Sequence, residues 1–262
     1  MSGAASYDER RARALRLADS YAAVAGPLRF AAGLFRLQAR IARALAEAHA
    51  VRPLSGHPDR DSDRFLGLGE GLLTFTESEG PPELAEIARA RRADEPDTAR
   101  SRLLLYWGGE REGADDFLSR ALLRPYVEAL AEAGVVPDRS RREGHCPLCG
   151  GRPIVAVREG DPASPGIYRG LVCGLCGALW RFSRTRCPSC LEEEPAKLPL
   201  FQAELYPAVR LDACESCRLY VKSIDLELER SALPEVDDLA SLPMDLWAVR
   251  EGYRRIEPGW GG

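Results

Sequence analysis

The chain has 262 residues, a hydrophobic fraction of 45% and a formal net charge of −4 at pH 7. This length favours two domains over one, and the composition is that of a soluble globular protein. The slight acidic excess gives no bulk electrostatic reason to expect a nucleic-acid or membrane-surface partner. No stretch approaches 18 uninterrupted apolar residues, and the N-terminal segment lacks the apolar core of a signal peptide. We therefore expect a cytoplasmic protein without membrane insertion.

Residues 1–135 have the pattern of an α-helical domain. Apolar side chains recur at helical steps on both sides of Gly26-Pro27, and Pro27 suits the first turn of a second helix. Further helical patterns cover residues 64–78, 82–93, 97–107 and 114–133. The charged stretch 136–144, which contains Pro137, is the expected linker.

After this linker the chain changes to short extended runs that are broken by Gly, Pro and Cys. The runs that predict strands are Ile154–Val157, Leu198–Leu205 and Tyr220–Leu228. We expect two four-cysteine ribbons over residues 145–185 and 186–230, then a helical tail over 231–262 that Pro243 divides. The predicted fold class is α+β: an N-terminal all-α domain, two tandem rubredoxin-like or zinc-ribbon modules and a short C-terminal helical tail.

All eight cysteines fall into Cys-x-x-Cys pairs. The pairs are Cys146/Cys149, Cys173/Cys176, Cys187/Cys190 and Cys214/Cys217. Steps of 3, 24 and 3 residues recur in both halves, and the whole unit repeats at an offset of 41 residues. The match extends to Arg169 with Arg210 and to Arg181 with Lys222. A tandem duplication of one module is the simplest account.

This spacing indicates metal sites. A Cys-x-x-Cys turn directs both sulfurs toward one point, and two such turns complete a tetrahedron around Zn²⁺ or iron. Pairing within each repeat explains the two identical spacings, while cross-braced or nested pairing stays open. A reducing cytosol disfavours disulfides, and a βαβ pattern for thioredoxin-like redox pairs is missing. His145 precedes Cys146, but four cysteines already close each site, so all eight cysteines are the predicted ligands of two ions, iron or zinc.

The sequence argues against catalysis. A closed four-cysteine site has no open position for a substrate. The chain has no Gly-rich phosphate loop, no Gly-x-Ser-x-Gly motif and no metal-binding His pair. Acidic and basic residues are equal in number over residues 144–230, which disfavours a nucleic-acid-binding ribbon. Two uses of the four-cysteine sites remain. One is a structural clip that displays a binding surface, and the other is a one-electron redox centre.

Several longer motifs surround these cysteines. They are His-Cys-Pro-Leu-Cys-Gly-Gly-Arg-Pro (145–153), Tyr-Arg-Gly-Leu-Val-Cys-Gly-Leu-Cys-Gly-Ala-Leu-Trp-Arg (168–181), Arg-Cys-Pro-Ser-Cys (186–190), Ala-Cys-Glu-Ser-Cys-Arg-Leu-Tyr-Val-Lys-Ser-Ile-Asp (213–225) and Val-Asp-Asp-Leu-Ala-Ser-Leu-Pro-Met-Asp-Leu (236–246). Together they resemble the formate dehydrogenase accessory protein family, FdhE. The resemblance is strong over residues 145–257 and weaker over the helical half. It departs from the family at Trp180-Arg181, where a Trp-His step is frequent.

The resemblance implies a cytoplasmic, non-enzymatic accessory factor for respiratory formate dehydrogenases. Such a factor binds the molybdenum- or tungsten-containing catalytic subunit before twin-arginine export and is needed for its activity. The resemblance also implies rubredoxin-like sites that can carry iron, with cysteine pairs that function requires. The alternative function is a rubredoxin-type redox protein that passes single electrons through iron–tetrathiolate sites.

Overall fold

The computed structural model describes residues 6–110, 116–160 and 166–258, which form two compact units. One unit comprises Ser6–Ala12 and Arg29–Ser140, and the other comprises Arg13–Leu28 with the described residues from Arg141 onward. Among the described residues, no helix is both long enough and apolar enough to cross a membrane. The domain limits expected from the sequence stay predictions.

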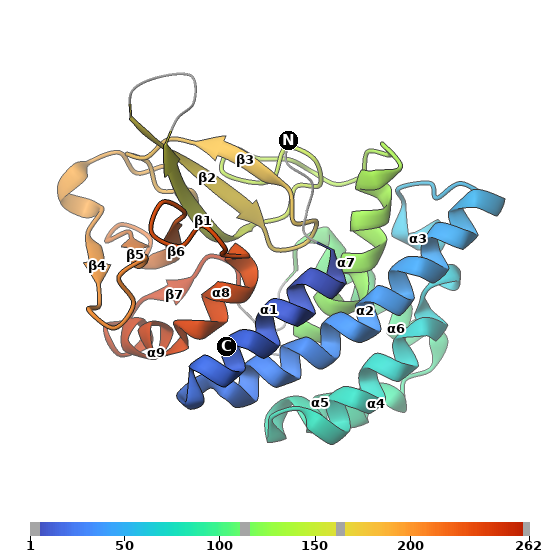
Figure 1. Cartoon of the computed structure of the whole chain (residues 1–262). Coiled ribbons are helices and arrows are strands. Elements are labelled where there is room, and N and C mark those ends of the chain that lie inside the picture. The colour runs from blue at the N-terminus through green and yellow to red at the C-terminus, as the bar shows by residue number, and fades with distance from the viewer. Residues whose placement is uncertain (1–5, 111–115, 161–165, 259–262) are drawn as a thin grey trace. The chain divides into compact units, whose positions relative to one another are not determined.

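The helical part of the chain agrees closely with the expected pattern. Its helices are α1 (Tyr7–Ser20), α2 (Ala25–Val51), α3 (Pro58–Asp61), α4 (Glu70–Glu79), α5 (Pro82–Arg92), α6 (Pro96–Gly108) and α7 (Asp116–Glu132) (Figure 1). Pro27 lies in the first turn of α2, as predicted. The helix expected from residue 64 begins later, because 3₁₀ turns precede α4. The predicted start of the last helix at 114–115 lies outside the described residues.

Apolar packing and buried polar contacts hold the helical unit together. Leu34 and Phe35 of α2 are fully buried, and Gln38 on the same helix donates a hydrogen bond to the Ala121 carbonyl at 2.8 Å. That bond satisfies the amide nitrogen of Gln38 in the apolar stripe of α2, whereas its Oε1 has no hydrogen-bond partner among the described residues.

The second unit is built on one sheet, to which each repeat contributes three strands. They are β1 (Pro153–Gly160), β2 (Ile167–Cys173) and β3 (Leu179–Phe182) from the first repeat, and β4 (Leu200–Gln202), β5 (Val209–Ala213) and β6 (Leu219–Asp225) from the second. The strand order is β3-β2-β1-β6-β5-β4, with β7 (Arg254–Arg255) beside β6. Pairing is antiparallel within each repeat, whereas β1 and β6 join the repeats in parallel.

The C-terminal helices are fixed to this sheet by a buried lysine. The helices are α8 (Pro234–Ala240) and α9 (Leu242–Arg250), and Pro243 lies in the first turn of α9, where the sequence predicts a division of the tail. Lys222 on β6 is 0% exposed, and its Nζ lies 2.6 Å from Asp245 Oδ2 and 3.1 Å from Asp238 Oδ1. Two carboxylates and a hydrogen bond to Ser241 therefore compensate the buried charge.

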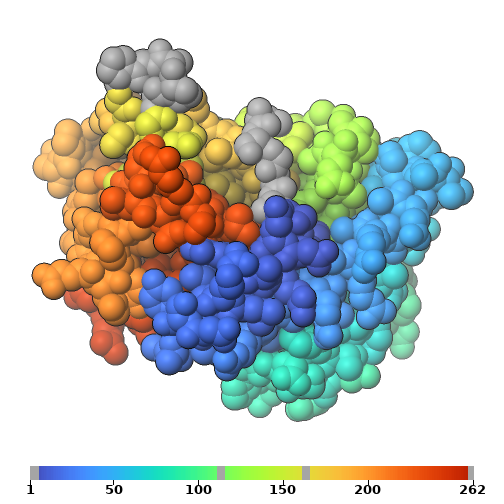
Figure 2. All heavy atoms as spheres, in the orientation of Figure 1, coloured from blue at the N-terminus to red at the C-terminus, as the bar shows by residue number. Residues whose placement is uncertain are grey.

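The early part of the chain also belongs to the sheet unit. Arg13 on α1 forms a two-nitrogen contact with Asp237 on α8, in which Nε lies 3.0 Å from Oδ2. Figure 2 shows the two segments side by side, the early one in blue and α8 in orange-red. A planar guanidinium fork on a carboxylate is a strong and directional ion pair, so these contacts attach Arg13–Leu28 to the C-terminal part of the chain.

Candidate metal centres

The four Cys-x-x-Cys turns share one backbone arrangement. In the first turn the Cys146 amide donates to the Gly151 carbonyl at 2.8 Å, and the Gly150 amide donates to the Cys146 carbonyl at 2.9 Å. The same two bonds recur in each of the other turns at 2.9–3.1 Å. These bonds close a tight loop in which both sulfurs lie on one side.

The residue after each pair adopts a left-handed conformation. Its φ is +69° at Gly150 and +68° at Gly177, but also +64° at Leu191 and +56° at Arg218. Such angles cost a residue with a Cβ about 1–2 kcal/mol relative to glycine. The turn geometry is therefore the same in both repeats, although only the first repeat has glycine at these positions.

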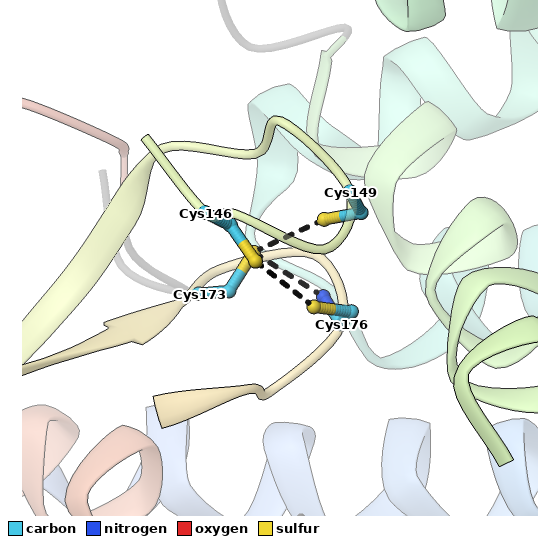
Figure 3. Close-up of side chains that lie close together, drawn as sticks. All are labelled: Cys146, Cys149, Cys173 and Cys176. Atoms are coloured by element: carbon cyan, nitrogen blue, oxygen red, sulfur yellow. Dashed lines mark hydrogen bonds between the residues drawn. The ribbon is translucent and has the colours of Figure 1, made fainter. Parts of the chain in front are cut away.

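The structure brings the sulfurs together within each repeat, as expected. Cys146, Cys149, Cys173 and Cys176 form one cluster, and Cys187, Cys190, Cys214 and Cys217 form the other, with all four sulfurs of a cluster within 4.8 Å of one another. Figure 3 shows the four sulfurs of the first cluster converging from two turns. Cross-braced and nested pairing would join sulfurs that lie in different clusters.

The sulfur spacing fits a tetrahedral ion. Two sulfur–sulfur distances are 3.5 and 3.6 Å in the first cluster, and two are 3.6 and 3.8 Å in the second. Metal–sulfur bonds of about 2.3 Å in a tetrahedron separate the sulfurs by about 3.8 Å, whereas a disulfide requires about 2.05 Å. All eight cysteines are free of disulfide bonds. The two clusters could therefore each hold one ion, and four thiolates suit zinc and iron alike.

Burial opposes ionisation of some of these thiols. Burial raises the pKa of Cys173 well above its ordinary value and that of Cys187 to about 11. Backbone amides partly oppose this penalty, since the Leu175 amide lies 3.4 Å from Cys173 Sγ and the Ser189 amide lies 3.4 Å from Cys187 Sγ. A bound divalent ion would reverse the penalty, because it binds thiolates in preference to thiols.

The two clusters differ in exposure despite their identical spacing. All four cysteines of the first cluster are buried, whereas Cys190 is exposed and Cys217 is half-buried in the second. Gly151 also packs against the first cluster, and it corresponds in the second repeat to Glu192, which has a side chain. Neither cluster includes His145. The sequence spacing revealed neither the difference in exposure nor the role of Gly151.

Comparison with known proteins agrees with the motif resemblance. Residues 185–259 match the family model described as FdhE, C-terminal domain. An FdhE homolog from Aquifex aeolicus (strain VF5) is 27% identical over 205 residues, which cover 77% of this chain and 71% of that protein. An FdhE homolog from Pseudomonas aeruginosa is 33% identical over 138 residues, which cover 51% of this chain and 43% of that protein.

A solved structure extends the similarity to the fold. The crystal structure of the FdhE protein from Pseudomonas aeruginosa superposes with a TM-score of 0.68 and 25% sequence identity, over 98% of this chain and 95% of that chain. The two chains therefore share a similar overall fold. The resemblance to the FdhE family is confirmed in sequence and in fold.

Proposed function

We propose that this chain is a non-enzymatic accessory factor that binds the catalytic subunit of a respiratory formate dehydrogenase in the cytoplasm and is needed for that enzyme's activity. The similarity to FdhE proteins in sequence and in fold supports this proposal. The observation that carries it is the pair of closed four-cysteine clusters in one sheet. Four sulfurs complete a tetrahedral shell and leave no place for a substrate, which favours a binding role over catalysis.

In this proposal the clusters stabilise the surface that meets the partner. The residues that would hold the ions, iron or zinc, are Cys146, Cys149, Cys173 and Cys176 in one site and Cys187, Cys190, Cys214 and Cys217 in the other. A bound ion supplies cross-links among turns that have few apolar residues of their own. No nucleic acid is part of the proposal, because the surrounding charge is balanced.

Co-purification from a host that makes a respiratory formate dehydrogenase tests this function. The tagged chain should capture the catalytic subunit, and Cys149→Ser and Cys190→Ser should weaken capture and lower formate oxidation in cells. Ser20→Ala, on the exposed end of α1, is the matched control and should behave as wild type. Failure to capture that subunit by a chain that holds both ions would refute the proposal.

The alternative, a rubredoxin-type redox protein, has one structural feature in its favour. Cys190 is exposed, and an exposed site exchanges electrons with a partner more readily than a buried one. A colourless zinc protein isolated from its own host would exclude this alternative. A red chromophore that dithionite bleaches would support it.

A further inference from the structure

A cavity of about 320 Å³ lies beside the second cluster and is lined by residues of both repeats. Its charged lining consists of Arg169, Arg184, Arg186, Arg210 and Asp212. Its apolar lining includes Leu198, Leu200 and Ile256. Arg169 and Arg210 are equivalent positions of the two repeats, 41 residues apart, so the duplicated module has brought two arginines to one cavity.

Arg169 on β2 is buried, yet only one edge of its guanidinium is satisfied. It is 3% exposed, and its Nη1 donates to the carbonyls of Ser183 at 3.3 Å and Arg186 at 3.2 Å. Its Nε and Nη2 have no hydrogen-bond partner among the described residues. Asp212 Oδ2 lies 3.7 Å from Nε, too far for a hydrogen bond, and Asp212 Oδ1 accepts from Arg210 Nε at 2.7 Å. The two-nitrogen edge that normally grips an oxyanion therefore makes no hydrogen bond, although an Asp212 oxygen lies beside it.

Neighbouring charges add to the positive potential at this edge. Arg158 on β1 is the direct strand partner of Arg169 and lies 3.2 Å from Asp225. Burial lowers the pKa of Arg158 and of Arg169, and the charge of Arg210 lowers both further. Asp212 opposes the effect at both arginines, Asp225 opposes it at Arg158, and Cys187 opposes it at Arg169. The guanidiniums of Arg158, Arg169 and Arg210 thus share the two carboxylates of Asp212 and Asp225 in a partly desolvated environment. Such an arrangement is stabilised by an additional anion.

We propose that this cavity binds a small organic anion, whose phosphate or carboxylate head accepts hydrogen bonds from Nε and Nη2 of Arg169. The body of the ligand would lie against Leu198, Leu200 and Ile256. The cavity is at the lower end of the range for ligand pockets, about 300–1,000 Å³, so the ligand must be small. Cys187 and Cys214 of the second cluster also line this cavity, but the proposed contacts are with Arg169 and not with the sulfurs, and they do not rest on the proposed function.

Calorimetric titration of the full, metal-loaded chain tests the inference. The probes are phenyl phosphate, benzoate and inorganic phosphate, all at one fixed ionic strength. At least one of the two aromatic probes should bind saturably with one site per chain, and phenyl phosphate should bind more tightly than inorganic phosphate. Preference for phenyl phosphate or for benzoate distinguishes a phosphate head from a carboxylate head.

Arg169→Lys is the main variant, because it keeps the charge but loses the two-nitrogen edge. It should weaken binding at least about tenfold, the effect of losing one charge-assisted contact. Arg230→Lys is the control, since Arg230 is 82% exposed and lies outside the cavity lining. This control should bind like wild type, and circular dichroism with metal content checks that each variant is folded.

A second variant, Leu200→Glu, tests the same cavity if Arg169→Lys does not fold. Leu200 is 58% exposed on the β4 edge of the cavity, so Leu200→Glu places a negative charge there without burying it. It should weaken anion binding at least about threefold by charge repulsion. Absence of saturable binding for both aromatic probes, or unchanged binding in both variants, would overturn the inference.

Discussion

Gly151 offers a sharp test of how tightly the first cluster is built. A Cβ placed on Gly151 would lie 2.7 Å from Cys173 Sγ and 3.3 Å from Cys149 Sγ. Ordinary contact begins at 3.4 Å, so in Gly151→Ala the Cys173 sulfur and the new methyl group must separate by about 0.7 Å, the difference between 2.7 and 3.4 Å. Metal–ligand distances tolerate only about 0.2 Å. The added methyl group should therefore displace one ligand from the first cluster.

We expect Gly151→Ala to hold one ion per chain in place of two, with the second cluster intact. Overpacking of this kind also lowers the free energy of unfolding by about 1–3 kcal/mol. Glu192→Ala is the control for metal content, because Glu192 is the equivalent position of the second repeat and already has a Cβ. It is not a control for stability, because the Glu192 carboxylate accepts hydrogen bonds from Ser216 and from the Glu194 amide. Elemental analysis of reduced, desalted protein measures the ions, and thermal unfolding measures stability. Two tightly held ions and unchanged melting in Gly151→Ala would refute the reasoning.

Three further predictions follow from burial and charge. A chelator that changes colour on binding metal should report two rates of metal release, a fast one from the cluster with exposed Cys190 and a slow one from the buried first cluster. A single common rate of release would contradict this prediction. Lys222→Met should lower the free energy of unfolding, measured with denaturant, by about 3–5 kcal/mol, because the two buried carboxylates of Asp238 and Asp245 would keep only one cation, Arg255. Arg181→Met, at the equivalent exposed position of the first repeat, should cost less than about 1 kcal/mol. Although burial opposes it, the charges of Arg255 and Lys222 hold the pKa of Asp245 below its ordinary value. The ionised Asp245 therefore contributes its full stabilisation above the unfolded pKa of about 3.9, and this stabilisation is lost as the pH falls through the lower folded pKa. Asp245→Asn should flatten the acid side of the plot of unfolding free energy against pH. An unchanged acid side would count against this role of Asp245.

The cysteine spacing was sufficient to predict the clusters because a Cys-x-x-Cys turn is a local structure. Each repeat forms an antiparallel strand pair between its two Cys-x-x-Cys turns, β1 with β2 and β4 with β5. The helical periodicity around Pro27 and the break at Pro243 depend on local backbone preferences as well, and both were predicted correctly.

Long-range pairing was beyond the reach of the sequence pattern. The parallel contact between β1 and β6 merges two modules into one sheet, and the spacing within a module carries no information about this contact. Arg13 and Asp237 are 224 residues apart in the chain, so their ion pair could not be inferred from periodicity. Lys222 and Arg181 are equivalent in sequence, yet one is buried and the other exposed, because α8 and α9 cover only one of them.

The central claim is that each four-cysteine cluster binds one ion in a shell of four sulfurs. Elemental analysis combined with X-ray absorption on reduced protein, freshly isolated from its own host, tests this claim directly. We predict two tightly held ions per chain, each with four sulfur neighbours at about 2.3 Å. Fewer than two ions, or a shell that contains nitrogen or oxygen ligands, would contradict it.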